Sequence, residues 1–276
     1  MGRGPRKWTE EIVEQRITEG RGSWLEEPYQ PWIEVFDFSS RGKVNRIYSP
    51  KLRRTIHLMS DVETNVFLGL EWQERNSGIY EQIRLDRDLT VEIARNLGIK
   101  HPCYPRTSVP EVITADFLVT RGDDASVPLE AYDCKMTSDA EEPRTIEKLS
   151  ITQRYFSGMN IPYHLIFDTE IPLQKIRNIR WIRDGVIKPG EDESYVTLLR
   201  DRVLRMAYEL KVSTRDDSLS DYCSSFEVRH GLNKGDGLRI ARILMYERTL
   251  LCDLNNPDLP TCPLPAFMLN SQRGRN

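Results

Sequence analysis

Residues 111–136 read EVITADFLVTRGDDASVPLEAYDCKM, and this stretch decides the fold class. The run 111–120 alternates, with Ile113, Ala115, Phe117 and Val119 on one side, and the turn-like segment RGDDAS separates it from a second strand-like run, 127–136. Alternation with a period of two is typical of strands that bury one face. The stretch therefore predicts two adjacent strands that pair in the antiparallel sense.

The segments on either side of this stretch predict helices and further extended structure. Residues 8–20 and 61–74 have apolar residues at helical spacing, and residues 143–156 begin with a proline, which suits a first helical turn. Residues 161–171 are expected to form a third, mostly buried strand, and residues 31–38 a strand or an extended segment. Two antiparallel strands followed by a helical crossover to another strand predict a mixed α/β sheet with flanking helices.

A change in composition near residues 183–193 indicates a domain boundary. This segment is polar and contains proline and glycine, as linkers often do. We therefore expect one domain over residues 1–185 and a smaller one over residues 186–276. Three helical segments and a possible hairpin in the second part favour a mainly helical, winged-helix-like domain. Such domains bind DNA or other proteins, and the sequence does not choose between these partners.

The composition excludes several classes of protein. Apolar residues make up 39% and charged residues 29% of the 276 residues, which is typical of a soluble domain with a sizeable core. No apolar run is long enough to cross a membrane, and no apolar stretch follows the basic N-terminus as in a secretory signal. The five cysteines form no C-x-x-C pair, so we expect neither a zinc ribbon nor a disulfide framework. Such a chain fits a reducing compartment, and the expected location is the cytoplasm.

A basic strip extends from Arg41 to His57, with six Lys or Arg residues and no acidic residue. The net charge of the whole chain is −3, so the protein is not a general binder of polyanions. A local basic strip on such a chain indicates either a directed contact with phosphates or a solvated surface loop.

Glu63 can be explained in two ways, which are compatible with each other. Ser60 and Glu63 have the spacing of a capping box, in which each residue satisfies a backbone amide at the start of a helix. However, Glu63 also lies at helical spacing from Val66, Phe67 and Leu70, which places its carboxylate on the apolar face. A helix cap does not explain that orientation, whereas a functional site does.

Asp116, Asp133 and Lys135 are the remaining candidates. An aspartate in the middle of a strand is disfavoured, and burying its charge without a partner is costly. Asp133 and Lys135 lie two residues apart and share a face of their strand, as an exposed ion pair or a catalytic pair would. If the two strands form a hairpin, Asp116 and Asp133 lie side by side.

Gathered carboxylates repel each other unless a cation binds them, and oxygen ligands are those that Mg²⁺ and Mn²⁺ prefer. A lysine beside such a site can orient a water molecule or offset charge on a phosphate in the transition state. The pattern therefore predicts metal-dependent hydrolysis of phosphodiesters. The chain has no G-x-S-x-G motif and no P-loop, and its four histidines show no ligand spacing.

The order Glu63, Asp116, Asp133-x-Lys135 resembles that of the PD-(D/E)xK, or restriction-endonuclease-like, nucleases. Longer segments of the chain are similar to the TnsA family of transposon endonucleases over roughly residues 10–182, whereas the C-terminal part is similar mainly in length and helical pattern. These segments are ITEGRG (17–22), YQPWIEV (29–35), NRIYSP (45–50), HLMSDVETNVFLGLEW (57–72), GIKHP (98–102), TADFLV (114–119), RTIEKL (144–149) and IPYHLIF (161–167).

The resemblance implies a restriction-endonuclease-like mixed sheet with a metal site. Glu63, Asp116, Asp133 and the carbonyl of Cys134 would hold Mg²⁺, with Mn²⁺ as a substitute and two ions per site, and Lys135 would position the attacking water. Asp133 departs from the best-known family member, which has glutamine there, and the spacing between the strand ligands is about one residue longer. The residues expected to contact the DNA backbone are Arg6, Lys7, Arg41, Lys43, Arg46, Lys51, Arg53, Arg54 and, more weakly, Lys148.

The resemblance also implies partners. A family member cleaves the 5′, non-transferred strands at the ends of a transposon, while a TnsB-like recombinase cuts and joins the 3′ ends and a TnsC-like AAA+ ATPase regulates both. Two alternatives remain open at this point. One is a non-catalytic DNA-binding subunit that assembles the transposition complex, and the other is a free-standing restriction or repair nuclease.

Overall fold

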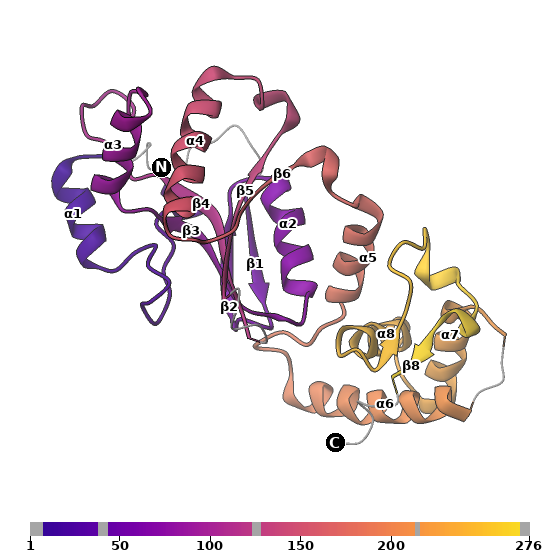
Figure 1. The fold of residues 1–276 in the computed structure, drawn as a ribbon. Coiled ribbons are helices and arrows are strands. Elements are labelled where there is room, and N and C mark those ends of the chain that lie inside the picture. The colour runs from indigo at the N-terminus through magenta and orange to yellow at the C-terminus, as the bar shows by residue number, and fades with distance from the viewer. Residues whose placement is uncertain (1–7, 38–43, 123–127, 213–215, 271–276) are drawn as a thin grey trace. The chain divides into compact units, whose positions relative to one another are not determined.

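The computed structural model describes residues 8–37, 44–122, 128–212 and 216–270, and Figure 1 shows the course of the chain. The chain divides into two compact units, Met1–Ile171 and Pro172–Asn276. Among the described helices, none combines the length and apolar character that a bilayer crossing requires.

The first unit is built around a mixed sheet of four strands in the order β3-β4-β5-β6. β4 pairs antiparallel with β3 and with β5, which confirms the predicted antiparallel pair. After the helical crossover α4, β6 lies parallel to β5, also as predicted. The elements of this core are β3 (Asn76–Arg84), β4 (Thr114–Arg121), β5 (Leu129–Lys135), α4 (Pro143–Gly158) and β6 (Tyr163–Phe167).

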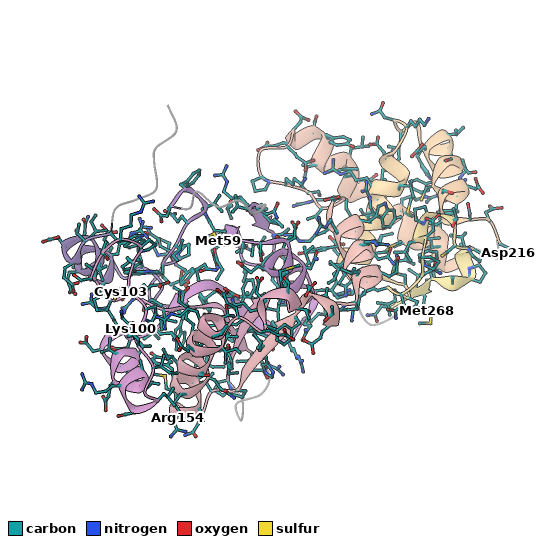
Figure 2. The ribbon with its side chains drawn as sticks, turned by 90° about the horizontal axis from the view of Figure 1, so that it is seen from above. Met59, Lys100, Cys103, Arg154, Asp216 and Met268 are labelled. Atoms are coloured by element: carbon teal, nitrogen blue, oxygen red, sulfur yellow. The ribbon has the colours of Figure 1, made fainter. Side chains whose placement is uncertain are left out.

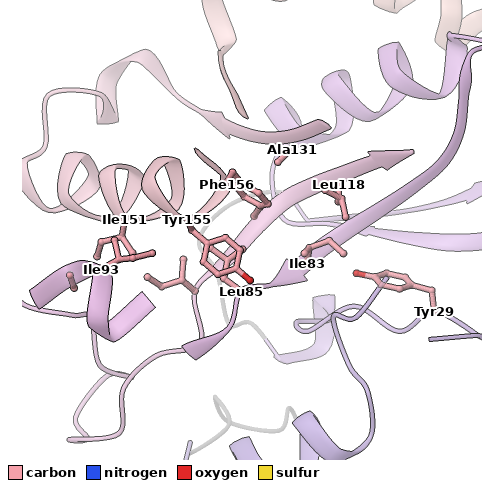
Figure 3. Close-up of a cluster of buried hydrophobic side chains, with 12 residues drawn as sticks. Tyr29, Ile83, Leu85, Ile93, Leu118, Ala131, Ile151, Tyr155 and Phe156 are labelled. Carbon is pink, nitrogen blue, oxygen red and sulfur yellow. The ribbon is translucent and has the colours of Figure 1, made fainter. Parts of the chain in front are cut away.

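Helices cover both faces of this sheet, and Figure 1 shows α2 (Asp61–Trp72) and α4 on opposite sides of the strands. Consecutive strand residues point to opposite faces. Phe117 of β4 accordingly stacks on Phe67 of α2, with ring centroids 6.4 Å apart. The next residue, Leu118, belongs to the buried cluster that includes Tyr155 and Phe156 of α4 (Figure 3). The sheet is thus a buried platform whose strand ends can carry a site.

Several smaller elements complete the first unit. The basic strip contains an antiparallel hairpin, with Asn45 paired to Leu58 and Ser49 to Arg54. The elements are α1 (Glu10–Thr18), the 3-10 helix η1 (Val35–Asp37), β1 (Asn45–Ser49), β2 (Arg54–Leu58), α3 (Arg87–Asn96) and the 3-10 helices η2 (Thr137–Asp139) and η3 (Asp168–Glu170).

Two predictions in this unit are wrong. In the described part of the segment 31–38, which ends at residue 37, the chain forms no strand and ends in η1. β6 was expected to be mostly buried, but each of its five residues is only partly buried. The reason is its position at the edge of the sheet, where it has a neighbouring strand on one side.

The second unit is mainly helical, as predicted. Its helices are followed by two short antiparallel strands, with Leu250 paired to Leu269. The elements are α5 (Leu173–Arg183), α6 (Glu193–Val212), α7 (Leu219–His230), α8 (Asp236–Tyr246), β7 (Leu250–Leu251), the 3-10 helices η4 (Leu259–Thr261) and η5 (Leu264–Ala266), and β8 (Met268–Leu269).

The division between the units falls before α5, so the boundary predicted after residue 185 lies inside the second unit. The physical reason is that α5 is anchored to the rest of that unit. Asn178 is buried and its amide nitrogen donates to the carbonyls of Leu254 and Asn256 at 2.8 and 2.7 Å. The polar segment at 183–193 is therefore a connection between two helices of one unit.

Candidate active site

The candidate site lies where the backbone ladder between β4 and β5 is replaced by side chains. Regular pairing of the two strands ends at Phe117 and Tyr132. At the next position, Oδ1 of Asp133 accepts the backbone amide of Asp116 at 2.9 Å, and Oδ2 of Asp116 accepts that of Cys134 at 2.7 Å. The two carboxylates therefore lie side by side between the strands, which confirms the predicted juxtaposition.

Lys135 completes this group from the end of β5. Its ammonium nitrogen lies 3.6 Å from Oδ2 of Asp116 and donates to the carbonyl of Cys134 at 3.0 Å. Asp133 is only 3% exposed, so an exposed ion pair between Asp133 and Lys135 is excluded. The charge of Asp116 raises the pKa of Lys135 above its usual value despite burial, so this lysine is a cation.

Glu63 is both a helix cap and a neighbour of the strand carboxylates. Its backbone amide donates to Oγ of Ser60 at 3.0 Å, and that hydroxyl donates back to Oε1 of Glu63 at 3.1 Å. The amide of Met59, which is labelled in Figure 2, donates to Oε2 at 2.9 Å. The Glu63 carboxyl group is buried. Both explanations of Glu63 are therefore compatible with its geometry.

Gln82 links Glu63 to Asp116 and was not identified from the sequence. Its amide nitrogen lies 3.3 Å from Oε2 of Glu63 and 3.4 Å from Oδ1 of Asp116. Gln82 is buried in β3, and its φ of 52° is in the left-handed region that residues other than glycine seldom adopt. A glutamine within an otherwise regular strand gives no sequence signal for this role, because the residues it joins are distant in the chain.

A second polar partner, Tyr163 of β6, holds the other side of Asp133. Its hydroxyl donates to Oδ2 of Asp133 at 2.7 Å. Burial and the adjacent carboxylate raise the pKa of Tyr163 well above its usual value, so the hydroxyl remains a donor. The parallel register, which pairs Ala131 with Tyr163, brings this side chain to the site.

The site is short of positive charge. Burial and the charge of Asp116 raise the pKa of Glu63 to about 8 and that of Asp133 to about 6. Lys135 is the basic side chain whose charge lowers both values. Three buried carboxyl groups with one ammonium group form an arrangement that a divalent cation would stabilise.

The donor atoms suit Mg²⁺ or Mn²⁺ better than a softer metal. The oxygens come from Glu63, Asp116, Asp133 and the Cys134 carbonyl, and each carboxylate oxygen that accepts a hydrogen bond keeps a second lone pair. Burial raises the pKa of the Cys134 thiol well above its usual value, and the atom of Cys134 that is assigned to the metal is the backbone carbonyl oxygen. Within the described ranges, no three His, Cys, Asp or Glu side chains are arranged so that they could already hold a metal ion.

The basic residues predicted to contact DNA fall into four groups. Arg46 and Arg53 are exposed on the β1-β2 hairpin, and the Arg46 guanidinium lies 4.9 Å from the centre of the Phe36 ring. Lys51 instead donates to the carbonyl of Gln73 at 2.6 Å, at the end of α2. The predicted positions that lie outside the described residues are Arg6, Lys7, Arg41 and Lys43.

Arg54 and Lys148 are each engaged with a carboxylate of the first unit, and their contact with DNA stays a prediction. Arg54 forms a two-point contact with Glu81, whose side chain is fully buried, at 2.8 and 2.6 Å. Lys148 donates to both oxygens of Glu111 at 3.1 and 2.9 Å. The sequence separations of 27 and 37 residues explain why neither pair was foreseen.

Comparison with known proteins agrees with this division into two units. The family model described as "TnsA-like endonuclease N terminal" matches residues 77–168, and "TnsA endonuclease C terminal" matches residues 170–254. The two matches meet close to the observed division after Ile171. The chain is also 32% identical over 246 residues to the transposon Tn7 transposition protein TnsA of Escherichia coli, which covers 88% of this chain and 86% of that protein.

Proposed function

Because this chain belongs to the TnsA family of endonucleases, we propose that it is a Mg²⁺-dependent DNA endonuclease that cleaves the 5′, non-transferred strands at transposon ends. The observation that carries this proposal is the group of three buried carboxyls, Glu63, Asp116 and Asp133, with the half-buried Lys135 beside them. A group of buried charges is costly to fold and is favoured where it performs a reaction.

Four oxygen donors are assigned to the metal: the carboxylates of Glu63, Asp116 and Asp133 and the carbonyl of Cys134. Mg²⁺, for which Mn²⁺ can substitute, would supply Lewis acidity and a water of lowered pKa, and we assign two ions to each site.

Lys135 acts as a cation in this scheme. Since its pKa is raised, it is a poor base near neutral pH. Its ammonium hydrogens can orient the attacking water and offset charge on the scissile phosphate. Hydrolysis breaks the bond between phosphorus and the 3′ oxygen, which leaves a 5′-phosphate and a 3′-hydroxyl.

The β1-β2 hairpin is proposed to place the DNA through its backbone. Arg46 and Arg53 are the described candidates, and Arg6, Lys7, Arg41 and Lys43 remain predictions. Phosphate contacts fix register without reading sequence, so the choice of transposon end is assigned to a TnsB-like recombinase. A TnsC-like ATPase would regulate the reaction in the cytoplasm, where the transposon DNA is found.

The test is a transposition assay in cells with Asp116→Asn and Lys135→Ala. Loss of 5′-strand cleavage with intact 3′ joining is expected to give cointegrates in place of simple insertions. Asp139→Ala is the matched control, since Asp139 is exposed in η2 of the same unit. Simple insertions at the normal frequency in both site variants would contradict the assignment.

A further inference from the structure

Gln82 has three contacts that together fix its orientation. The hydroxyl of Thr114 donates to the Gln82 carbonyl oxygen at 3.2 Å. Carboxylate oxygens accept hydrogen bonds, whereas a threonine hydroxyl can donate or accept, so the amide nitrogen faces Glu63 and Asp116 and the carbonyl oxygen faces Thr114. The carboxylates therefore set the orientation of the amide, and Thr114 holds its opposite end.

The amide nitrogen of Gln82 supplies hydrogen-bond donors to two carboxylates that have none of their own. It carries two hydrogens, and it lies at similar distances, 3.3 and 3.4 Å, from one oxygen of Glu63 and one of Asp116. The other oxygens are held elsewhere: Oε1 of Glu63 accepts from the Ser60 hydroxyl, and Oδ2 of Asp116 accepts from the amide of Cys134. A neutral donor between two buried carboxylates reduces their repulsion without adding a charge that would compete with Lys135.

The backbone at Gln82 is held in an uncommon conformation that serves this contact. With a φ of 52°, the residue departs from extended geometry, although its neighbours Glu81 and Ile83 keep regular pairing with β4. The backbone carbonyl of Gln82 accepts a hydrogen bond from the backbone amide of Trp32 at 3.1 Å, which anchors this part of the strand to the adjacent loop. Strained backbone positions that the surrounding structure holds in place occur preferentially at functional sites.

From these observations we infer that Gln82 is a positioning residue, oriented by Thr114, that sets the separation and direction of the Glu63 and Asp116 carboxylates for metal binding. This inference rests on the proposed function. Gln82 itself is assigned no contact with the DNA or the metal. A residue that orients ligands typically changes metal affinity by about 10- to 100-fold when it is removed.

The test uses Gln82→Met. Methionine has a side chain of similar length and meets the same strain at a φ of 52°, but it lacks both amide hydrogens. Mn²⁺ is titrated calorimetrically into the purified full-length chain without DNA, so the readout is independent of cleavage. We expect an affinity weaker by about tenfold or more, and a thermal midpoint close to that of Gln73→Met. Gln73 is a control in the same unit, because its side chain accepts only from Arg75 among the described contacts.

Thr114→Val provides a second variant in case Gln82→Met does not fold. It removes the hydroxyl that orients Gln82 and is expected to weaken Mn²⁺ binding several-fold, whereas Thr120→Val on the same strand is expected to leave binding unchanged. In cleavage assays, both site variants should need more Mg²⁺ for half-maximal rate and recover at high Mg²⁺.

Wild-type Mn²⁺ affinity in both Gln82→Met and Thr114→Val would overturn the inference and leave the proposed function intact. Asp116→Asn separates the two claims. If the wild-type chain binds Mn²⁺ and Asp116→Asn does not, the metal site stands and only the role of Gln82 is at issue. If the wild-type chain binds no Mn²⁺, both the metal site and the role of Gln82 are contradicted.

Discussion

Replacing Arg54 by methionine distinguishes a structural arginine from one that contacts DNA. The Arg54 guanidinium contacts both oxygens of Glu81 and donates to the carbonyl of Ile79 at 2.7 Å. Methionine would remove this partner from the fully buried Glu81 carboxylate. Among the described contacts of that carboxylate, the backbone amide of His57 would still donate to it at 3.1 Å. Removing one partner of a buried ion pair costs about 3–5 kcal/mol. Since the His57 contact remains, we expect a loss of about 3 kcal/mol, at the lower end.

This loss corresponds to a fall in the thermal midpoint of about 6–12 °C, at about 2–4 °C per kcal/mol for a unit of this size. Circular dichroism during heating measures it, and Arg53→Met is the matched control because Arg53 is the exposed neighbour. The double variant Arg54→Met with Glu81→Gln should lose less stability than the sum of the two single changes. If Arg54→Met had the same thermal midpoint as Arg53→Met but bound DNA more weakly, the structural role of Arg54 would be refuted and its assignment to the DNA backbone supported.

Three further predictions concern other contacts. Burial acts to raise the pKa of Glu209, but hydrogen bonds from Arg229, His230 and Arg205 outweigh it and lower that pKa to about 2. The stability that this group contributes is therefore present above about pH 4.5, the usual pKa, and is lost as the pH falls toward 2. Urea titrations should show that Glu209→Gln is less stable than the wild type at pH 7 and that its stability is less sensitive to acid. Parallel pH profiles of the two proteins would contradict this. Tyr163→Phe removes a donor to Asp133 and should slow strand cleavage about tenfold, whereas Tyr132→Phe on β5 should not; equal rates would exclude a role for Tyr163. A Cβ at position 237 would lie 2.5 Å from the Cys223 carbonyl oxygen, so Gly237→Ala should lower the free energy of unfolding by about 1–3 kcal/mol. Gly158→Ala is the control, because its Cβ would meet no atom within 4 Å. Equal stability of the two variants would show that α7 and α8 can separate freely.

The elements with strong local patterns could be predicted from the sequence. The alternation in residues 111–136 located β4 and β5, and the cap at Ser60 located the start of α2. Asp116, Asp133 and Lys135 could be grouped because a hairpin register follows from neighbouring strands. Local pattern and short-range pairing therefore sufficed for the centre of the site.

Contacts between distant segments could not be predicted in this way. Gln82 meets residues 19 and 34 positions away, and Arg54 meets one 27 positions away. The segment 31–38 has the composition of a strand, yet no strand lies beside it in the described sheet order, so η1 forms in its place. Likewise α5 belongs to the second unit because of contacts with residues more than seventy positions later, such as that of Asn178 with Leu254.

The most direct test of the central claim is strand-resolved cleavage of end-labelled transposon DNA with purified partner proteins. With Mg²⁺, the wild-type chain should release the 5′ strand with a 5′-phosphate, and chelation of the metal should stop this. Asp116→Asn should abolish 5′-strand cleavage while 3′ cleavage and joining by the recombinase continue. Undiminished 5′-strand cleavage by Asp116→Asn would contradict the account, because it would place the catalytic centre elsewhere.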